Sequence, residues 1–212
     1  MCVALAGCAS APAQGRPFNL LQAKAAVSAY CDSGAYERDI AVAATQARDW
    51  IEHRVARRSP GERFAVVFDV DETVLSNAPL IRRLDYAFLP GAWERWFEAA
   101  EAPAIEPIRQ IFGLAGELGV ASVFVTGRRD PSHRAATERN LRMCGMDGYE
   151  RLVMAPASHP KGLIAEFKAS ARLALQREGY TIIANIGDQE SDLRGGQAER
   201  SFKLPDPFYL VE

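Results

Sequence analysis

The chain has 212 residues, of which 48% are hydrophobic, and its formal net charge is -2. This length and composition are typical of one compact domain with a full apolar core. The 25 basic residues are balanced by 27 acidic ones and form no long runs, which argues against a broad basic face for a nucleic-acid polymer. The sequence also has no apolar run long enough to span a bilayer.

Residues 1–18 are predicted to be a signal remnant followed by a flexible tether. The run Leu5-Ala-Gly-Cys8 is similar to the end of a bacterial lipoprotein signal, in which the cysteine becomes the lipidated N-terminus. Small, polar, Pro and Gly residues follow it, as in a flexible tether. The apolar stretch before Cys8 is short and no positive charge precedes it, so an ordinary N-terminal segment is the alternative. The lipoprotein interpretation predicts a periplasmic or outer-membrane location, with membrane contact only through Cys8.

Two helices are predicted next, over residues 19–30 and 36–58, and together they form a helical preface over residues 19–60. In the second helix Ala41, Ala44, Ala47 and Ile51 recur at helical spacing, which indicates one packing face. The run Ser59-Pro-Gly61 ends the preface.

Strands and helices then alternate along the chain. Strands are predicted at 64–70, 121–125, 151–154, 181–186 and 201–204, with helices at 105–118, 132–144 and 161–178 and a short one near Ser191. This alternation predicts an α/β fold of three layers, a mostly parallel sheet flanked by helices. Residues 19–212 are therefore expected to form a single domain, in which 76–104 is the one region left for a small lid.

Three acids, Asp69, Asp71 and Glu72, lie at the carboxyl end of the first predicted strand. The carboxyl end of such a strand is where an open α/β sheet binds its ligand. Because side chains alternate along an extended chain, Asp69 and Asp71 are expected to point the same way and to share one metal and one substrate. An acid-rich turn that caps the next element is the alternative.

The run Thr126-Gly127-Arg128 closes the second predicted strand. The hydroxyl of Thr126 can donate to a phosphoryl oxygen, and Gly127 lets backbone N–H groups approach that oxygen closely. A plain turn with Thr126 as a helix cap is an equally simple interpretation.

Lys168 and Arg172 lie four residues apart, so they share one face of a predicted helix. An ammonium at Lys168 that reaches a phosphate would neutralise charge during transfer. The alternative is a solvated lysine that pairs with Glu166 or Glu178.

Asp188 and Asp192 follow the fourth predicted strand. Carboxylates of Asp69 and Asp188, completed by a backbone carbonyl and waters, suit Mg²⁺. Four polar clusters in this order, each after a strand or on a facing helix, indicate a site for phosphoryl transfer.

The four clusters resemble the ordered motifs of the haloacid-dehalogenase (HAD) superfamily. The surrounding residues are similar to its acid phosphatase branch, subfamily IIIB with the class B/C type enzymes, which includes bacterial lipoprotein acid phosphatases, plant acid phosphatases and vegetative storage proteins. The wider match includes Asp71-Glu-Thr-Val-Leu-Ser-Asn77, Phe167-Lys168 with Arg172, and Arg200-Ser-Phe-Lys-Leu-Pro-Asp-Pro-Phe208-Tyr.

The resemblance implies a nucleophile at Asp69, which forms an aspartyl-phosphate. It makes Asp71 the general acid and base, and members of the superfamily that remove halide lack that second acid. It also implies Mg²⁺ held by the carboxylates of Asp69 and Asp188 and by the backbone carbonyl of Asp71. The expected substrate is a small phosphomonoester, with nucleoside monophosphates as candidates. A phosphotransferase and a retired storage or binding protein are the alternatives.

The resemblance places Thr126, Gly127 and Lys168 on the phosphoryl oxygens. Asp192 and Arg172 are expected to hold these residues in position rather than to bind the phosphoryl group themselves. Asp192 would do so by holding Lys168 or a metal-bound water.

Three questions remain open at the level of the sequence. Trp93 and Trp96 could clamp an aromatic leaving group or pack the lid on the body, and packing is the favoured interpretation. Cys31 and Cys144 could form a disulfide or remain thiols. The three histidines match none of the four motifs, and surface or helix-end positions are expected for them.

Overall fold

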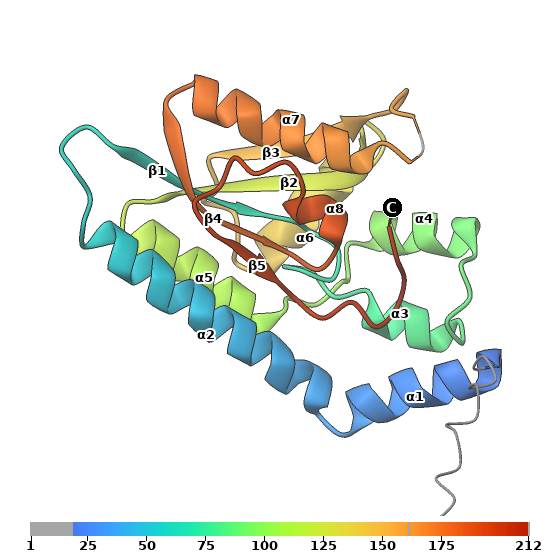
Figure 1. Ribbon diagram of the computed structural model, residues 1–212. Helices are drawn as coiled ribbons and strands as arrows, with labels where there is room; N and C mark the ends of the chain where they lie inside the picture. The colour runs from blue at the N-terminus through green and yellow to red at the C-terminus, as the bar shows by residue number, and fades with distance from the viewer. Residues whose placement is uncertain (1–18, 161, 212) are drawn as a thin grey trace, which may run out of the picture.

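The computed structural model describes residues 19–160 and 162–211, so Cys8 and its predicted lipidation lie outside the described residues. The described chain forms a parallel sheet in the order β3-β2-β1-β4-β5 (Figure 1). Its strands are β1 (Arg63–Phe68), β2 (Ala121–Asp130), β3 (Arg151–Pro156), β4 (Tyr180–Gly187) and β5 (Ser201–Lys203). The predicted α/β sheet is confirmed.

Helices cover both faces of this sheet, as the alternation in the sequence predicts. They are α1 (Leu20–Asp32), α2 (Ala35–Val55), α3 (Ala78–Arg83), α4 (Pro90–Ala99), α5 (Glu106–Glu117), α6 (Arg134–Met143), α7 (Ile164–Arg177) and α8 (Glu190–Leu193). Helix α7 lies on one face, and α2 and α5 lie on the other (Figure 1). Within the two described ranges, no helix has the length and apolarity needed to cross a membrane.

The two N-terminal helices differ in how they attach to the body. Helix α1 starts at a capping box, in which Asn19 and Gln22 each accept a hydrogen bond from the other's backbone N–H, and it buries none of its own residues. Helix α2 buries Ala44, Ala47 and Ile51 of the predicted packing face, but Ala41 is exposed and Ile40 is buried in its place. Because α2 packs on the sheet, it forms part of the layer beside α5.

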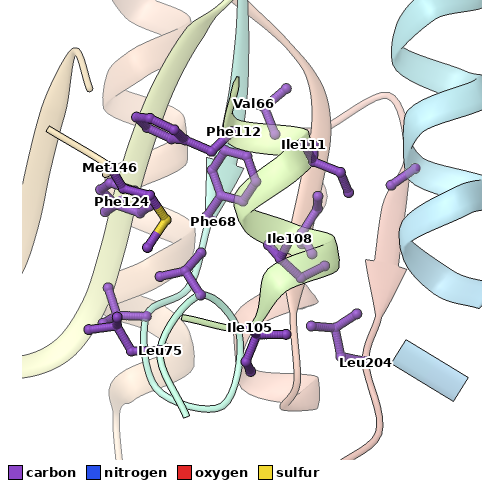
Figure 2. Close-up of a cluster of buried hydrophobic side chains, with 14 of the residues drawn as sticks. Val66, Phe68, Leu75, Ile105, Ile108, Ile111, Phe112, Phe124, Met146 and Leu204 are labelled. Carbon is purple, nitrogen blue, oxygen red and sulfur yellow. The ribbon is translucent and has the colours of Figure 1, made fainter. Parts of the chain in front are cut away.

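Strand β1 is apolar and buried on both faces from Phe64 to Phe68, whereas Arg63 at its start is exposed. Val66 and Phe68 pack with Ile108 and Ile111 of α5 on one face (Figure 2). Ala65 and Val67 join a second apolar cluster under α7 on the opposite face. A central strand of a parallel sheet buries both faces in this way. Truncating Phe68 to alanine would cost about 3–5 kcal/mol of stability.

Strand β2 is longer than the sequence predicts. It was expected to end at residue 125, but it runs to Asp130 because it pairs with β3 again after an irregularity between Thr126 and Arg129. Gly127 and Arg128 fall inside this bulge. Bulges interrupt the ladder and redirect side chains, often next to active sites.

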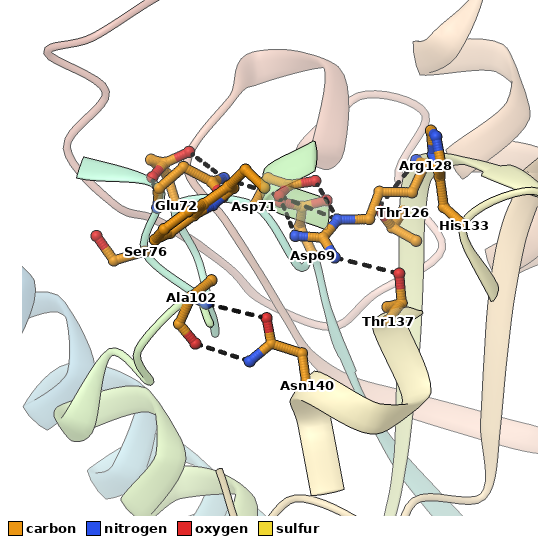
Figure 3. Close-up of polar contacts among 12 residues, drawn as sticks. Asp69, Asp71, Glu72, Ser76, Ala102, Thr126, Arg128, His133, Thr137 and Asn140 are labelled. Carbon is orange, nitrogen blue, oxygen red and sulfur yellow. Dashed lines mark hydrogen bonds and ion pairs between the residues drawn. The ribbon is translucent and has the colours of Figure 1, made fainter. Parts of the chain in front are cut away.

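The predicted lid region, 76–104, contains α3 and α4 (Figure 1). Its far end is fastened to α6, because the Asn140 side chain accepts from the backbone N–H of Ala102 at 3.2 Å and donates to its carbonyl at 2.8 Å (Figure 3). Cys31 and Cys144 are both free thiols, so the disulfide alternative is not realised.

Candidate functional site

The residues predicted for the site converge at the carboxyl ends of β1, β2 and β4. The backbone N–H of Asp69 donates to the carbonyl of Ile186 at 2.9 Å, so the ladder between β1 and β4 extends to the first acid. The side chains of Asp69, Lys168 and Asp188 are all buried. A buried set of charges needs mutual pairing or a bound ion to be stable.

Lys168 lies between two of the acids. Its Nζ donates to Oδ1 of Asp69 and to Oδ1 of Asp192, at 2.5 Å in each case. The alternative pairing of Lys168 with Glu166 or Glu178 is therefore wrong, and Glu178 pairs with Arg151 instead. The predicted support of Lys168 by Asp192 is present in the structure.

Burial and charge shift the proton affinities of these groups in opposite directions. Burial, followed by the repulsion of Asp192, raises the pKa of Asp69 to about 7 even though Lys168 opposes the rise. Burial acts to lower the pKa of Lys168, but the attraction of Asp192 and Asp69 outweighs it and raises that pKa above the ordinary value. A cation bound between such buried carboxyl groups would favour their ionised form and lower these pKa values.

Asp69, Asp188 and Asp192 could hold a divalent metal ion, since one carboxylate oxygen from each lies within 4.8 Å of the others. Both oxygens of Asp192 are already engaged, one by Lys168 and the other by the backbone N–H of Gln189 at 2.8 Å. Asp188 accepts from Thr73 at 3.3 Å and from the Gln189 side chain at 2.6 Å. The donor set of carboxylate oxygens fits a hard cation.

Asp71 forms an ion pair with Arg128, which the sequence analysis did not assign to the site. Nη2 of Arg128 lies 2.7 Å from Oδ1 of Asp71, and Nε lies 3.0 Å from Oδ2 (Figure 3). Burial raises the pKa of Asp71, but the charge and hydrogen bonds of Arg128 outweigh this and hold the pKa below its ordinary value. Arg128 follows Thr126-Gly127 directly in the sequence, but its pairing with Asp71 is set by tertiary packing, which no pattern in the sequence reports.

Thr126 and Gly127 lie at the irregularity within β2 rather than past the end of that strand. Thr126 is completely buried, and its Oγ1 accepts from the backbone N–H of Arg128 at 3.2 Å. Gly127 lines the cavity above Asp69. A Cβ at Gly127 would lie 3.2 Å from the Ile164 side chain, so a larger residue would crowd this wall.

Arg172 acts through the backbone that follows β4. Its guanidinium donates to the carbonyl of Asp192 at 2.5 Å and also to that of Arg194. Gly187 adds a steric constraint on the same loop, because a Cβ there would lie 2.4 Å from the Cβ of Asp192. Together these residues fix the position of the carboxylate that holds Lys168.

A cavity of about 660 Å³ opens above Asp69 and Asp71. The lid and the C-terminal segment line it with aromatic residues, which include Tyr86, Phe88, Trp93, Phe97, Phe208 and Tyr209. Trp96 lies elsewhere: it is 7% exposed, and its indole N–H donates to Oδ1 of Asn77 at 2.8 Å. The packing interpretation therefore holds for Trp96, whereas Trp93 faces the cavity.

The histidines are not part of the acidic cluster. His133 occupies the N-cap position of α6, a helix end as expected, without a capping hydrogen bond from its side chain, and its Nε2 lies 2.9 Å from Oε2 of Glu94 on α4. His133 and His159 both line the cavity, although neither belongs to the four motifs.

A family model matches residues 4–212, and its description is HAD superfamily, subfamily IIIB (acid phosphatase). The chain belongs to this family. The resemblance found in the motifs of β1, β2, α7 and β4 is thereby confirmed.

Several known plant proteins are similar to about two thirds of the chain. Acid phosphatase 1 from Solanum lycopersicum is 34% identical over 149 residues, which are 68% of this chain and 58% of that protein. The stem 28 kDa glycoprotein of Glycine max is 36% identical over 152 residues, 69% of this chain and 59% of that protein. The matched part thus spans less than two thirds of the length of these relatives.

Among solved structures, the class C acid phosphatase from Bacillus anthracis shares the fold. Its TM-score is 0.74 at 21% sequence identity, and the superposition covers 90% of this chain and 86% of that one. The three-layer arrangement predicted from the sequence is thus that of a known member of the HAD fold.

Proposed function

We propose that the protein is a magnesium-dependent acid phosphatase that hydrolyses small phosphomonoesters through an aspartyl-phosphate on Asp69. The observation that carries this proposal is the environment of the Asp69 carboxylate. Lys168 holds Oδ1 at 2.5 Å, while Oδ2 accepts no hydrogen bond from the described residues and the side chain lines the cavity. One oxygen is positioned and the other is available to attack.

The first step transfers the phosphoryl group to Asp69. Oδ2 of Asp69 forms a bond to phosphorus, the bond from phosphorus to the leaving oxygen breaks, and Asp71 gives that oxygen a proton. In the second step Asp71 accepts a proton from water, which attacks phosphorus and releases phosphate and the free Asp69 carboxylate. Arg128 keeps Asp71 beside the cavity through both steps.

The groups around Asp69 suit the charge on a phosphoryl group. We assign Lys168, the Thr126 hydroxyl and the backbone at Gly127 to its oxygens. Mg²⁺ would be held by the carboxylates of Asp69 and Asp188 and by the backbone carbonyl of Asp71, and would supply further charge neutralisation. The assignment is supported by the carboxylate oxygens of Asp69 and Asp188, which lie within 4.8 Å of each other and so could bind one ion.

The cavity favours a substrate with an aromatic leaving group, such as an aryl phosphate or a nucleoside monophosphate. Trp93 and Tyr209 offer ring surfaces at the cavity wall, 6.4 Å apart between centroids. Stacking on such rings is favourable for flat, apolar groups. The class C acid phosphatase from Bacillus anthracis has also been solved with tungstate bound, an oxyanion of the same shape as phosphate.

Two other functions use the same set of residues. A phosphotransferase would pass the phosphoryl group to an alcohol in place of water. A retired storage protein is suggested by the Arabidopsis thaliana vegetative storage protein 1, which is 31% identical over 149 residues. The intact pairing of Asp69 with Lys168 and of Asp71 with Arg128 supports an active enzyme over a retired one.

We also propose that Cys8 carries a lipid that anchors the protein at a bacterial membrane facing the periplasm, with no nucleic-acid polymer as a partner. The support is the run Leu5-Ala-Gly-Cys8. Cys8→Ser should abolish both metabolic labelling with palmitate and partition into detergent. Labelling that persists in this variant would contradict the proposal.

The activity is tested with purified protein, Mg²⁺ and a panel of nucleotide, sugar and aryl phosphates. Wild type should release phosphate from at least one class, and Asp69→Asn should lower the rate by more than about 10²-fold because it lacks the nucleophile. Asp206→Asn is the matched control, since Asp206 forms an ion pair only with Lys203, outside the site. A wild type that releases no phosphate would contradict the enzyme assignment, and a fully active Asp69→Asn would contradict the mechanism.

A further inference from the structure

Asn77 makes a set of buried contacts that the proposed mechanism does not use. The residue is completely buried, and its Oδ1 accepts from the indole N–H of Trp96 at 2.8 Å. Its Nδ2 donates to Oδ1 of Asp71 at 2.8 Å and to Oε2 of Glu72 at 2.9 Å. Because an indole N–H can only donate, Trp96 fixes which end of the amide is oxygen. The amide nitrogen is therefore held toward Asp71.

Glu72 anchors Asn77 from the other side. Its backbone has φ of 56°, in the left-handed region that is unfavourable for a residue with a side chain. Its carboxylate is 1% exposed and accepts from the backbone N–H of Asn77 at 2.5 Å. The strained turn thus places a buried carboxylate against Asn77, beside the acid that faces the cavity.

The C-terminal segment completes this network. The Tyr209 hydroxyl donates to Oε2 of Glu72 at 2.7 Å. The side chain of Gln189 holds the same segment by donating to the carbonyl of Tyr209 at 3.3 Å and accepting from the N–H of Val211 at 2.9 Å. The segment that lines the cavity is thereby tied to the loops after β1 and β4.

We propose that Asn77 is a positioning residue for the proton transfer by Asp71, and that Glu72 and Tyr209 hold Asn77 in place. This inference rests on the proposed phosphatase activity. Oδ1 of Asp71 accepts from Asn77 at 2.8 Å and from Nη2 of Arg128 at 2.7 Å. Among the described residues, Oδ2 accepts only from Nε of Arg128, at 3.0 Å, and shares that donor with Oδ1. With Oδ1 held by two short hydrogen bonds, Oδ2 is the oxygen that carries the transferred proton.

The inference also links both walls of the cavity to the acid. Trp96 belongs to the lid helix α4, and Tyr209 belongs to the C-terminal segment. Each reaches Asp71 through Asn77. Correct placement of the acid therefore depends on closure of the lid and of the C-terminal segment against the loop after β1.

The test uses two substrates of similar shape that differ in their need for a proton. Phenolate leaves with help from a general acid, whereas p-nitrophenolate leaves readily without one. In Tyr209→Phe, kcat/KM for phenyl phosphate should fall about tenfold while that for p-nitrophenyl phosphate changes less than about threefold. The reason is that kcat/KM reports the step in which the leaving group departs, and only phenolate needs a proton from Asp71 to depart. Asn77→Asp, which replaces the donor by an acceptor, should show a larger loss with the same selectivity.

Tyr180→Phe is the matched control, because the Tyr180 hydroxyl also donates to a carboxylate, that of Glu150 at 2.8 Å, at the other end of β4. In this control, kcat/KM should be unchanged for both substrates. Suppose that wild type is active and that Tyr209→Phe lowers kcat/KM equally for both substrates, or for neither. That result would overturn the positioning role and leave the proposed function intact. A wild type that hydrolyses neither ester overturns this inference together with the proposed function. Thermal unfolding of Tyr209→Phe, which removes one hydroxyl, verifies that the comparison is made on folded protein.

Discussion

Arg128 and Asp71 form a two-point ion pair at the edge of the cavity, with 2.7 Å between Nη2 and Oδ1. The Arg128 side chain is 2% exposed, whereas that of Asp71 is 21% exposed. The arginine is thus a fixed, buried charge, and the carboxylate that it holds still reaches the cavity. Its guanidinium is held in turn by the Thr137 hydroxyl at 3.1 Å and lies over the ring of Phe97.

The first prediction concerns the pH dependence of hydrolysis in Arg128→Met. Burial alone would raise the pKa of Asp71, and Arg128 is the main group that holds it below the ordinary value. Without Arg128, Asp71 stays protonated to higher pH, so the alkaline limb of kcat/KM for phenyl phosphate should move to higher pH. Arg151→Met, which breaks the surface pair with Glu178, is the control and should leave the limb in place. A limb that stays fixed or moves to lower pH in Arg128→Met would contradict the pairing.

The second prediction concerns the stability of Lys168→Met. Removing the lysine leaves Asp69 and Asp192 buried without their shared counter-ion. Breaking a buried ion pair in this way costs about 3–5 kcal/mol. Lys203→Met removes a partly exposed lysine that pairs with Asp206 at 3.2 Å, and should cost less than about 1 kcal/mol. Urea unfolding of metal-free protein measures both values, and equal effects would show that Lys168 is not a buried counter-ion.

The third prediction concerns binding of Mg²⁺. If Mg²⁺ binds only the folded protein, a concentration of 100 times its Kd should stabilise wild type by about 2.7 kcal/mol. Asp188→Asn should lose most of this increase because one of the two proposed carboxylate ligands becomes neutral. Asp206→Asn should keep it. Thermal melts with Mg²⁺ and with EDTA give the comparison, and an undiminished Mg²⁺ response in Asp188→Asn would place the ion elsewhere.

The fourth prediction concerns the cavity wall. Trp93 lines the cavity, and its ring lies 5.7 Å from that of Phe97 and 5.8 Å from that of Phe88. Trp93→Ala should raise KM about tenfold for aryl and nucleoside phosphates, a loss of roughly 1.4 kcal/mol of ring contact. KM for glycerol phosphate, which has no ring, should change little. If KM rises equally for all three substrates, the tryptophan supports the lid rather than the leaving group.

The fifth prediction compares two glycine substitutions. Gly187→Ala would place a methyl group 2.4 Å from the Cβ of Asp192, so the loop must shift and stability should fall by about 1–3 kcal/mol. Gly113→Ala lies within α5 with no atom within 4 Å of the new methyl group, and should raise stability by about 0.5–1 kcal/mol. Urea midpoints report both changes. A Gly187→Ala protein as stable as wild type would mean that the loop after β4 adapts freely.

The sequence predicted the sheet well because each strand carries an unambiguous signal. Strand β1 is buried on both faces and reads as a continuous apolar run, and the acids that follow it mark its end. The end of β2 was missed because pairing with β3 resumes after the bulge at Gly127 and Arg128. Resumed pairing depends on a neighbouring strand and leaves no periodic pattern in β2 itself.

The acids and the lysine of the site could be found from the sequence because each follows a strand or lies on a helix above the sheet edge. The partners of Asp71 could not be found from the sequence in this way. Arg128, Asn77 and Tyr209 reach it directly or through Glu72 from three separate segments, and the choice of partner is set by tertiary packing. The spacing of Trp93 and Trp96 likewise places both on α4, but only the packed structure shows that one bonds Asn77 and the other faces the cavity.

The contact of Lys168 with two carboxylates has a consequence for the whole proposed reaction cycle. Asp69 alternates between a free anion and an ester, and as an ester it no longer offers Lys168 a full negative charge. Asp192 is not esterified in the proposed cycle, and its carboxylate contacts Lys168 at 2.5 Å. Lys168 therefore keeps a constant counter-ion in both half-reactions, and its position need not be rebuilt each time the phosphoryl group arrives or leaves.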